Sequence, residues 1–303
     1  MSLQDAERIP LGKEEPGMST SSQCKTIVIT GCSSGFGRVT ALYLAKLEWQ
    51  VFATVRKEVD QASLIESATA LGCEEHLSSL ICDITQSEQV IALGQIVAAK
   101  TPRLNALLNN AGTAFAAPLE LISSDDFRAQ LEINVVAHLG VTQTLLPLLK
   151  AAGGTIINVS SLNGRIAYPL VGAYSASKFA LEALSDVWRI ELAPFGVRVV
   201  VIEPGSSPTN LSETSHKRAV TKLEQYKGSP FEPLLIRFEK LASKANTAGF
   251  PPQLFADTVL RILSSRKPHA RYLIPRTNSI ILALLQLVPD WLWDRLIRRI
   301  LKW

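Results

Sequence analysis

The sequence predicts an α/β fold in which a single domain is built on a doubly wound parallel sheet. Three observations lead to this prediction. Short apolar runs rich in β-branched residues alternate with helix-length segments, a glycine-rich turn follows the first run, and no composition break or fixed-period repeat divides residues 25–203. Strands separated by helices need right-handed crossovers, which make the strands parallel and place helices on both faces of the sheet.

The predicted elements follow this alternation in order. The first strand, 26–30, is a β-branched run that ends at glycines, and the next segment, 39–47, has apolar residues at helical spacing. The same criteria give further strands at 50–55, 77–82, 106–109, 155–159, 197–202 and 271–274, and further helices at 61–71 and 87–99. Residues 26–277 therefore form the predicted domain.

Three segments depart from this pattern. Residues 1–25 are polar and lack the apolar core of a secretory signal, so we expect a flexible tail. Residues 206–252 contain five prolines and are too long for a simple connection, which is typical of a lid or substrate loop. Residues 278–303 are expected to form an amphipathic helical extension. No apolar stretch approaches the ~20 residues that span a bilayer, so no transmembrane helix is predicted.

Composition excludes several classes of protein. Hydrophobic residues make up 47% of the 303 and charged residues 19%, which excludes a wholly disordered chain. The net charge of +4 is too small to indicate a nucleic-acid partner. The cysteines have neither disulfide nor metal-ligand spacing, so we predict no metal site and a reducing, cytoplasmic setting. They are Cys24, Cys32, Cys73 and Cys82.

The glycine-rich turn at 30–37 lies where the first strand passes into the first helix. Glycines at 31, 35 and 37 allow the backbone to approach a pyrophosphate at the start of that helix. The turn lacks the Gly-Lys-Ser/Thr of a P-loop, which argues against ATP hydrolysis.

The end of the second strand carries Arg56, followed by Lys57. At this position, a protein that binds NAD has an acid that accepts hydrogen bonds from the free ribose hydroxyls. A guanidinium there favours a 2′-phosphate and hence NADP over NAD, with Arg38 as a second candidate. The alternative is that Arg56 is only a solvated surface charge.

Three polar clusters are predicted at the same edge of the sheet. Tyr174 and Lys178 are four residues apart and share one face if the segment is helical, so that the ammonium lowers the pKa of the phenol. Ser160 and Ser161 follow the strand at 155–159, and Asn109-Asn-Ala-Gly112 follows the strand at 106–109. Taken singly, each cluster could be an ordinary surface contact or turn. Because the carboxyl ends of parallel strands meet at one edge, together they indicate a catalytic site.

In family order, these motifs resemble the short-chain dehydrogenase/reductase family, with its Rossmann-type fold, from residue 26 to about 209. Asp83, Asn134, and Pro204-Gly205 with Thr209 complete the pattern. Within the family, the chain is similar to the retinol and hydroxysteroid dehydrogenase-like branch. Where the family has an aliphatic residue in its Pro-Gly motif, this chain has Ser207, followed by Pro208, which puts the carboxamide contacts in doubt.

The resemblance implies a role for each matching residue. Tyr174 would be the general acid/base, Ser161 rather than Ser160 would polarise the substrate oxygen, Lys178 would bind the nicotinamide ribose, and Asn134 would hold a water linked to the lysine. Asp83 would contact the adenine. The cofactor is expected against Gly31, Ser33, Ser34, Gly35, Phe36, Gly37, Arg56, Asp83, Asn110, Ala111, Gly112, Tyr174, Lys178, Pro204, Gly205, Ser207 and Thr209.

The expected function is hydride transfer between a nicotinamide cofactor, NADP in preference to NAD, and a hydrophobic alcohol or carbonyl such as a steroid, retinoid or lipid. Apolar residues at 168–171 and 115–117 border the predicted site, although they could equally be ordinary core. A homo-oligomer is also expected. One alternative is a catalytically idle nucleotide-binding sensor on the same fold. Another is a nucleotide-sugar epimerase or dehydratase, which the 31, 35, 37 glycine spacing disfavours.

The C-terminal segment 291–303 has an apolar stripe of 3.6-residue period opposite basic residues. Such a helix could contact an anionic membrane surface or could dock on the protein's own body or on a second subunit. His138 and His216 carry no signal for catalysis, so we expect core or surface roles for both.

Overall fold

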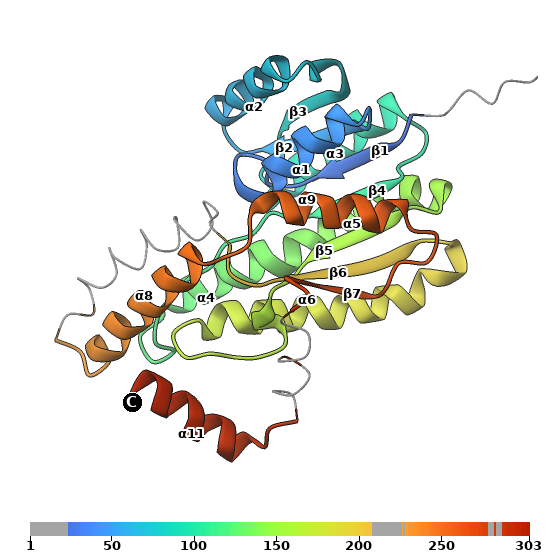
Figure 1. Cartoon of the computed structure of the whole chain (residues 1–303). Coiled ribbons are helices and arrows are strands. Elements are labelled where there is room, and N and C mark those ends of the chain that lie inside the picture. Colours follow the sequence, from blue (N-terminus) through green and yellow to red (C-terminus); the bar gives the residue numbers. More distant parts are fainter. Residues whose placement is uncertain (1–23, 208–225, 227, 278–281, 283–286) are drawn as a thin grey trace, which may run out of the picture.

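The computed structural model describes residues 24–207, 226, 228–277, 282 and 287–303. Seven parallel strands form one sheet in the order β3-β2-β1-β4-β5-β6-β7 (Figure 1). The strands are β1 Thr26–Ile29, β2 Gln50–Val55, β3 Leu77–Ile81, β4 Ala106–Asn109, β5 Thr155–Val159, β6 Arg198–Pro204 and β7 Arg271–Ile274. This confirms the predicted doubly wound parallel sheet.

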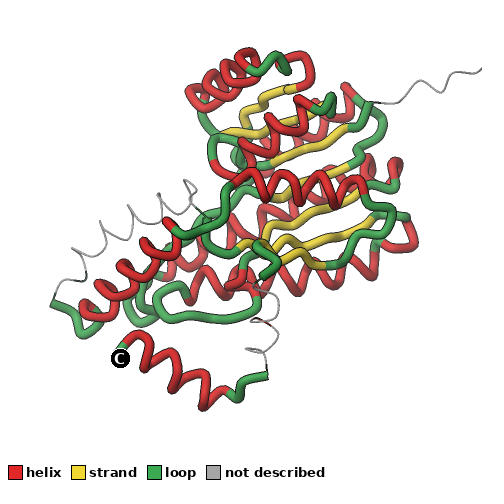
Figure 2. The backbone as a smooth tube through the Cα atoms, viewed as in Figure 1, coloured by secondary structure: helices red, strands yellow, loops and turns green. Residues whose placement is uncertain are grey.

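Two layers of helices cover the sheet, as the helices on either side of the strands in Figure 2 show. On one face, α1 (Gly35–Lys46), α2 (Glu58–Ala70) and α9 (Pro252–Ser264) pack against strand residues such as Ile29 and Ile157. On the other face, α3 (Ser87–Lys100), α5 (Ala137–Ala152) and α6 (Gly172–Glu191) pack against residues such as Val28 and Ile156. Because side chains alternate across a strand and both faces are covered, the central strands β1, β4 and β5 are buried along their whole length.

The predicted strands match the structure to within two residues at each end, and α3 begins at the predicted Ser87, whereas the first two helices begin earlier than predicted. α1 starts at Gly35 instead of residue 39, and α2 starts at Glu58 instead of residue 61. The glycines and charged residues in these first turns carry no apolar periodicity, which explains the late predictions. The long helix 124–152, formed by α4 (Ser124–Leu131), a π-helical turn (Glu132–Val136) and α5, was not predicted at all.

Among the described helices, the one from Ser124 to Ala152 is long and apolar enough to cross a membrane. Its inner side packs on the sheet through residues such as Val141 and Leu145, and it buries Asn134 and His138 inside the protein. This packing is that of a core helix, and length and composition alone are weak grounds for a membrane span.

Two further helices lie beyond the carboxyl ends of the central strands. They are α8 (Glu232–Thr247), which falls in the predicted 206–252 loop, and α11 (Asp290–Leu301), which falls in the predicted C-terminal extension. Figure 1 shows them side by side at one end of the molecule, and they contact each other. Arg237 of α8 donates hydrogen bonds to the carbonyls of Leu301 (2.7 Å) and Lys302 (2.8 Å), which fixes the end of α11.

Candidate active site

The glycine turn after β1 is shaped by close backbone packing. Gly31 has φ +72°, and a Cβ on it would lie 2.8 Å from the Cα of Ala111. A Cβ on Gly37 would lie 2.5 Å from both Asn110 Nδ2 and the Gly31 carbonyl oxygen. Asn110 Nδ2 in turn donates to the carbonyls of Thr30 (2.8 Å) and Gly31 (3.1 Å). The turn that follows β4 therefore holds the glycine turn in place, and only glycine fits at 31 and 37.

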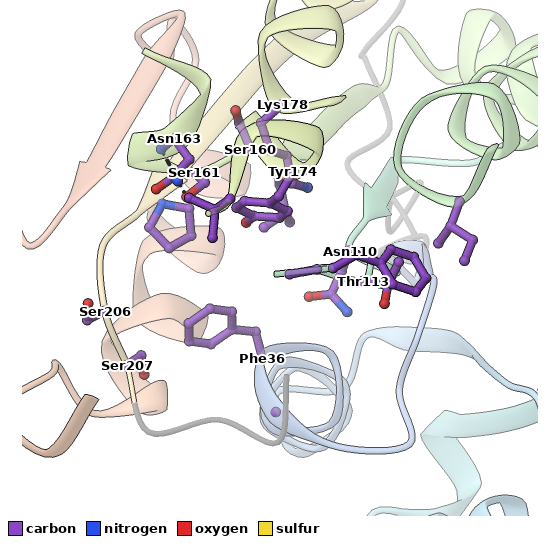
Figure 3. A pocket seen from close by; sticks show the side chains of 18 of the residues that line it. Phe36, Asn110, Thr113, Ser160, Ser161, Asn163, Tyr174, Lys178, Ser206 and Ser207 are labelled. Atoms are coloured by element: carbon purple, nitrogen blue, oxygen red, sulfur yellow. Dashed lines mark hydrogen bonds between the residues drawn. The ribbon is translucent and has the colours of Figure 1, made fainter. Parts of the chain in front are cut away.

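A cavity of about 810 Å³ lies at the carboxyl edge of the sheet (Figure 3). It brings together the predicted catalytic residues Ser161, Tyr174 and Lys178 with all but two of the predicted cofactor residues. Gly37 lies behind the turn and does not line the cavity, and Thr209 falls outside the described residues, as do Pro208 and His216. The backbone of Ser33 to Phe36, at the start of α1, faces this cavity and suits the pyrophosphate of a dinucleotide. The residues present thus fit a nicotinamide dinucleotide.

The two arginine candidates for a 2′-phosphate differ in placement. Arg56 is exposed at the cavity rim, and no described residue bonds to its guanidinium. Arg38 does not line the cavity, because its guanidinium donates to Ser63 (2.8 Å, carbonyl) and Ser67 (2.7 Å, hydroxyl) on α2. Arg38 is therefore used structurally. Asp83, the predicted adenine contact, also lines the cavity, and its Oδ1 accepts from the Thr85 backbone N–H.

Helix α6 supplies Tyr174 and Lys178, whose ammonium lies 5.7 Å from the tyrosine ring centre. Lys178 is 4% exposed, and its Nζ donates to the Val159 carbonyl at 2.7 Å. Burial lowers the pKa of Lys178 to about 8, while the negative charge of Glu182 raises it. The pKa of Tyr174 is raised by burial, which outweighs the hydrogen bond with Ser161 that lowers it. The prediction that the pKa of Tyr174 lies below its usual value is therefore wrong, because desolvation is the largest effect on this phenol.

Asn134 sits in the π-helical turn between α4 and α5, a distortion that often marks functional sites. Its Oδ1 accepts from the Thr113 N–H (2.9 Å), and its Nδ2 donates to the Thr113 carbonyl (3.0 Å) and to Ser177 Oγ (3.0 Å). Both amide hydrogens are thus used. A Cβ on Gly112 would lie 3.4 Å from Asn134 Oδ1 and 3.9 Å from Lys178 Nζ, so Asn134 stands close to the lysine.

Sequence reasoning missed Gln130, which is fully buried on α4. Its Oε1 accepts from the Phe115 N–H (2.8 Å), and its Nε2 donates to the Thr113 carbonyl (2.7 Å). Gln130 and Asn134 together clamp the cavity wall at 113–115, and no local pattern could have indicated this. His138 has the predicted core role: its Nε2 meets the Ala111 carbonyl at 2.7 Å, and burial lowers its pKa to about 3, so it is neutral.

The far half of the cavity is apolar and comes largely from segments that the sequence did not connect. Tyr168 packs edge-on against Trp293 of α11, with ring centres 5.7 Å apart. Ser207, in the Pro-Gly motif, lines the cavity, but its hydroxyl donates to the Phe250 carbonyl at 2.7 Å. The α8 and α11 residues on the wall are Phe238, Leu241, Ala242, Ala245, Trp293, Leu296, Ile297, Ile300 and Leu301. The C-terminal helix thus docks on the chain's own body.

Comparisons with known proteins agree with this geometry. Residues 25–219 match the family model described as short chain dehydrogenase. The chain is 34% identical to retinol dehydrogenase 5 of Mus musculus over 91% of this chain and 87% of that protein. It is 32% identical to an NADPH-dependent 3-dehydrocapnine reductase of Ornithobacterium rhinotracheale, over 91% of this chain and 96% of that protein.

Among solved structures, a short-chain dehydrogenase/reductase from Burkholderia phymatum in complex with NAD superposes with a TM-score of 0.74 at 22% identity, covering 86% of this chain and 92% of that one. This likeness shows the shared fold. The family model covers well over half of the chain, and its relatives are named dehydrogenases and reductases. The chain therefore belongs to the short-chain dehydrogenase/reductase family, in its retinol dehydrogenase-like branch, and is an oxidoreductase of the CH–OH/C=O couple.

Proposed function

We propose that the chain is an NADP-preferring oxidoreductase that interconverts a hydrophobic alcohol and its carbonyl, a steroid-, retinoid- or lipid-like molecule, with Tyr174 as acid/base. One observation carries this proposal: a single cavity joins the glycine turn and Tyr174 to an apolar wall from α8 and α11. Apolar walls with few polar groups select apolar ligands. The names of the two relatives, a retinol dehydrogenase and an NADPH-dependent reductase, support both parts.

The catalytic steps assigned to this chain are proton transfer and orientation. When bound, the nicotinamide supplies or accepts the hydride. In reduction, Tyr174 Oη donates its proton to the substrate oxygen while Ser161 Oγ donates a hydrogen bond to the same oxygen. Burial raises the pKa of Tyr174, so the phenol carries its proton at neutral pH. Lys178, whose Nζ donates a hydrogen bond to the Val159 carbonyl, positions the ribose. The proposal also assigns Asn134 to hold a water near the lysine.

The proposed function is tested by reduction assays with a series of ketones of increasing alkyl length. We expect NADPH consumption to become more efficient as the chain lengthens, because each added methylene buries further apolar surface on the α8 and α11 wall, worth about 0.8 kcal/mol. The measurement is kcat/KM from absorbance at the nicotinamide band. Tight cofactor binding without turnover of any carbonyl or alcohol would support an idle sensor instead.

The cofactor preference is tested by measuring the binding of each cofactor. Arg56→Ala is expected to weaken NADPH binding about tenfold or more and to leave NADH binding unchanged, because only NADPH carries the phosphate that the guanidinium would bind. Fluorescence titration with each cofactor measures the two dissociation constants. Arg38→Ala serves as a control, since that guanidinium is committed to α2. Equal loss of both cofactors in Arg56→Ala would contradict the assignment.

We further propose that α11 contacts an anionic membrane surface while its inner face closes the cavity, with the rest of the chain in the cytoplasm. Trp291 is 66% exposed and Trp303 51%, although Ile297 and Leu301 are buried. Basic side chains accompany the exposed rings on this helix, which suits anionic lipid headgroups. They are Arg295, Arg298, Arg299 and Lys302. The homo-oligomer stays a prediction.

Membrane contact is tested by co-sedimentation of the full chain with phosphatidylglycerol and with phosphatidylcholine vesicles. We expect sedimentation with the anionic vesicles only, and a several-fold loss in Trp291→Ser, since an interfacial indole supplies apolar area. Ile190→Ser on α6 is a matched control, because Ile190 is 69% exposed on another helix. The proposal fails if both substitutions act alike or if neither vesicle binds the parent chain.

A further inference from the structure

A buried carboxylate lies one helical turn beyond Lys178 on α6. Glu182 is 6% exposed, and its Oε2 accepts from Arg271 Nε of β7 at 3.1 Å. Within the described part of the chain, its Oε1 has no hydrogen-bond partner. A buried carboxylate with a free oxygen is costly unless its charge is used. Glu182 is four residues after Lys178 on α6, a spacing that places the two residues on the same face of the helix.

Arg271 is not a dedicated partner of Glu182, because it also interacts with two other acids. Its Nη2 bonds Asp186 at 2.7 Å, and its Nε lies 3.5 Å from Glu203. Glu203 also pairs with Arg165 at 3.0 Å, and Asp186 pairs with Arg189 at 2.7 Å. Asp186 is 42% exposed at its side chain, whereas the Glu182 side chain is 8% exposed. Of the two acids of this cluster on α6, Glu182 is therefore the buried one and Asp186 the exposed one, while Glu203, 4% exposed at its side chain, comes from β6.

Ser160 gives the cluster a polar neighbour at the active-site edge. It is 3% exposed, lines the cavity, and has no hydrogen bond of good geometry for its Oγ in the described residues. A Cβ on Gly164 would lie 2.5 Å from Ser160 Oγ and 3.3 Å from Glu182 Oε1, so both oxygens surround the same point. The nearby hydroxyl lowers the pKa of Glu182, which burial raises. Ser160, set aside as the substrate-polarising serine, thus faces the buried carboxylate.

The groups that face Lys178 come from three elements. Tyr174 and Glu182 are on its own helix, His138 comes from α5, and the Val159 carbonyl comes from β5. His138 is neutral because burial lowers its pKa to about 3. The negative charge of Glu182 consequently favours the protonated form of Lys178, which burial disfavours.

We propose that Glu182 is a positioning residue that keeps Lys178 protonated, and that Arg271 holds its carboxylate for this purpose, with Ser160 as a polar neighbour. The catalytic consequence rests on the proposed function, in which the charged lysine binds the ribose, whereas the effect on the lysine itself does not. Removing the negative charge lowers the pKa of Lys178, so the lysine loses its proton, and the enzyme its activity, at a lower pH.

The experiment compares Glu182→Gln with Asp186→Asn in the full chain. Asp186→Asn is matched because it also removes one anion from Arg271, but on the exposed side of the cluster. The pKa of Lys178 is measured by NMR titration of ¹³Cε-labelled lysine, with the signal assigned through Lys178→Met. The pH profile of kcat with NADPH and a long-chain ketone is measured in parallel.

In Glu182→Gln we expect the Lys178 titration and the alkaline limb of the profile to move to lower pH by about one pH unit. Asp186→Asn is expected to leave both in place. If Glu182→Gln does not fold, Glu182→Asp, which keeps the charge but withdraws it by one methylene, is expected to give a smaller shift in the same direction.

An unchanged Lys178 titration in the Glu182 variants, or an equal shift in Asp186→Asn, would overturn the inference. The NMR titration needs no turnover, so it decides the inference even if no carbonyl is reduced. Normal carbonyl reduction together with an unchanged pKa of Lys178 would contradict this inference but not the proposed function.

Discussion

Tyr174→Phe is expected to lower kcat for carbonyl reduction by about two to four orders of magnitude. The substitution removes the hydroxyl to which the proposed function assigns proton exchange with the substrate oxygen, and it leaves the ring, which lines the cavity, in place. NADPH binding is expected to stay within about twofold, since the glycine turn and Lys178 are untouched. Steady-state kinetics and a fluorescence titration of NADPH measure the two effects separately.

Tyr168→Phe is the matched control for this prediction. Tyr168 lines the same cavity, but its ring packs against Trp293 on the apolar side. Its substitution should change KM for apolar substrates more than kcat. Near-normal turnover in Tyr174→Phe, or an equal collapse of kcat in Tyr168→Phe, would contradict the role assigned to Tyr174.

Gly37→Ala is expected to abolish measurable nucleotide binding and to destabilise the fold by about 1–3 kcal/mol. The added Cβ would lie 2.5 Å from Asn110 Nδ2 and from the Gly31 carbonyl oxygen, and the second of these is backbone that cannot rotate away. Relief of this clash requires the glycine turn to separate from the turn after β4. Fluorescence titration of NADPH and urea unfolding measure the two losses.

Gly140→Ala controls for the general effect of the substitution. Gly140 also lies inside a helix, α5, and a Cβ there would meet nothing within 4 Å. This variant should bind NADPH normally and gain up to about 1 kcal/mol of stability from the better helix propensity of alanine. Parental NADPH affinity in Gly37→Ala would show that the turn is not the phosphate site.

The sequence by itself determined the sheet and the position of the motifs. Strands such as 50–55, 106–109 and 155–159 were placed with the observed bounds because strands buried on both faces are rich in apolar and β-branched residues, which is a local property of the sequence. Parallel crossovers then bring the carboxyl ends of these strands to one edge, so Ser161 and Tyr174 could be expected to meet there. The helix 124–152 escaped prediction because a π-helical turn at Glu132–Val136 interrupts its 3.6-residue period and because Pro147, a residue typical of helix ends, lies inside it.

Only the tertiary structure decided what surrounds those motifs. α11 docks beside α8 through a hydrogen bond between Arg237 and Leu301, which lies 64 residues later in the chain. This docking places the apolar side of α11 on the cavity wall. The Glu182–Arg271 pair joins residues 89 apart in sequence. Desolvation likewise reversed the expected direction of the Tyr174 pKa. Burial and charge are sums over neighbours that the fold brings together from distant parts of the chain, and residue spacing along the sequence does not contain them.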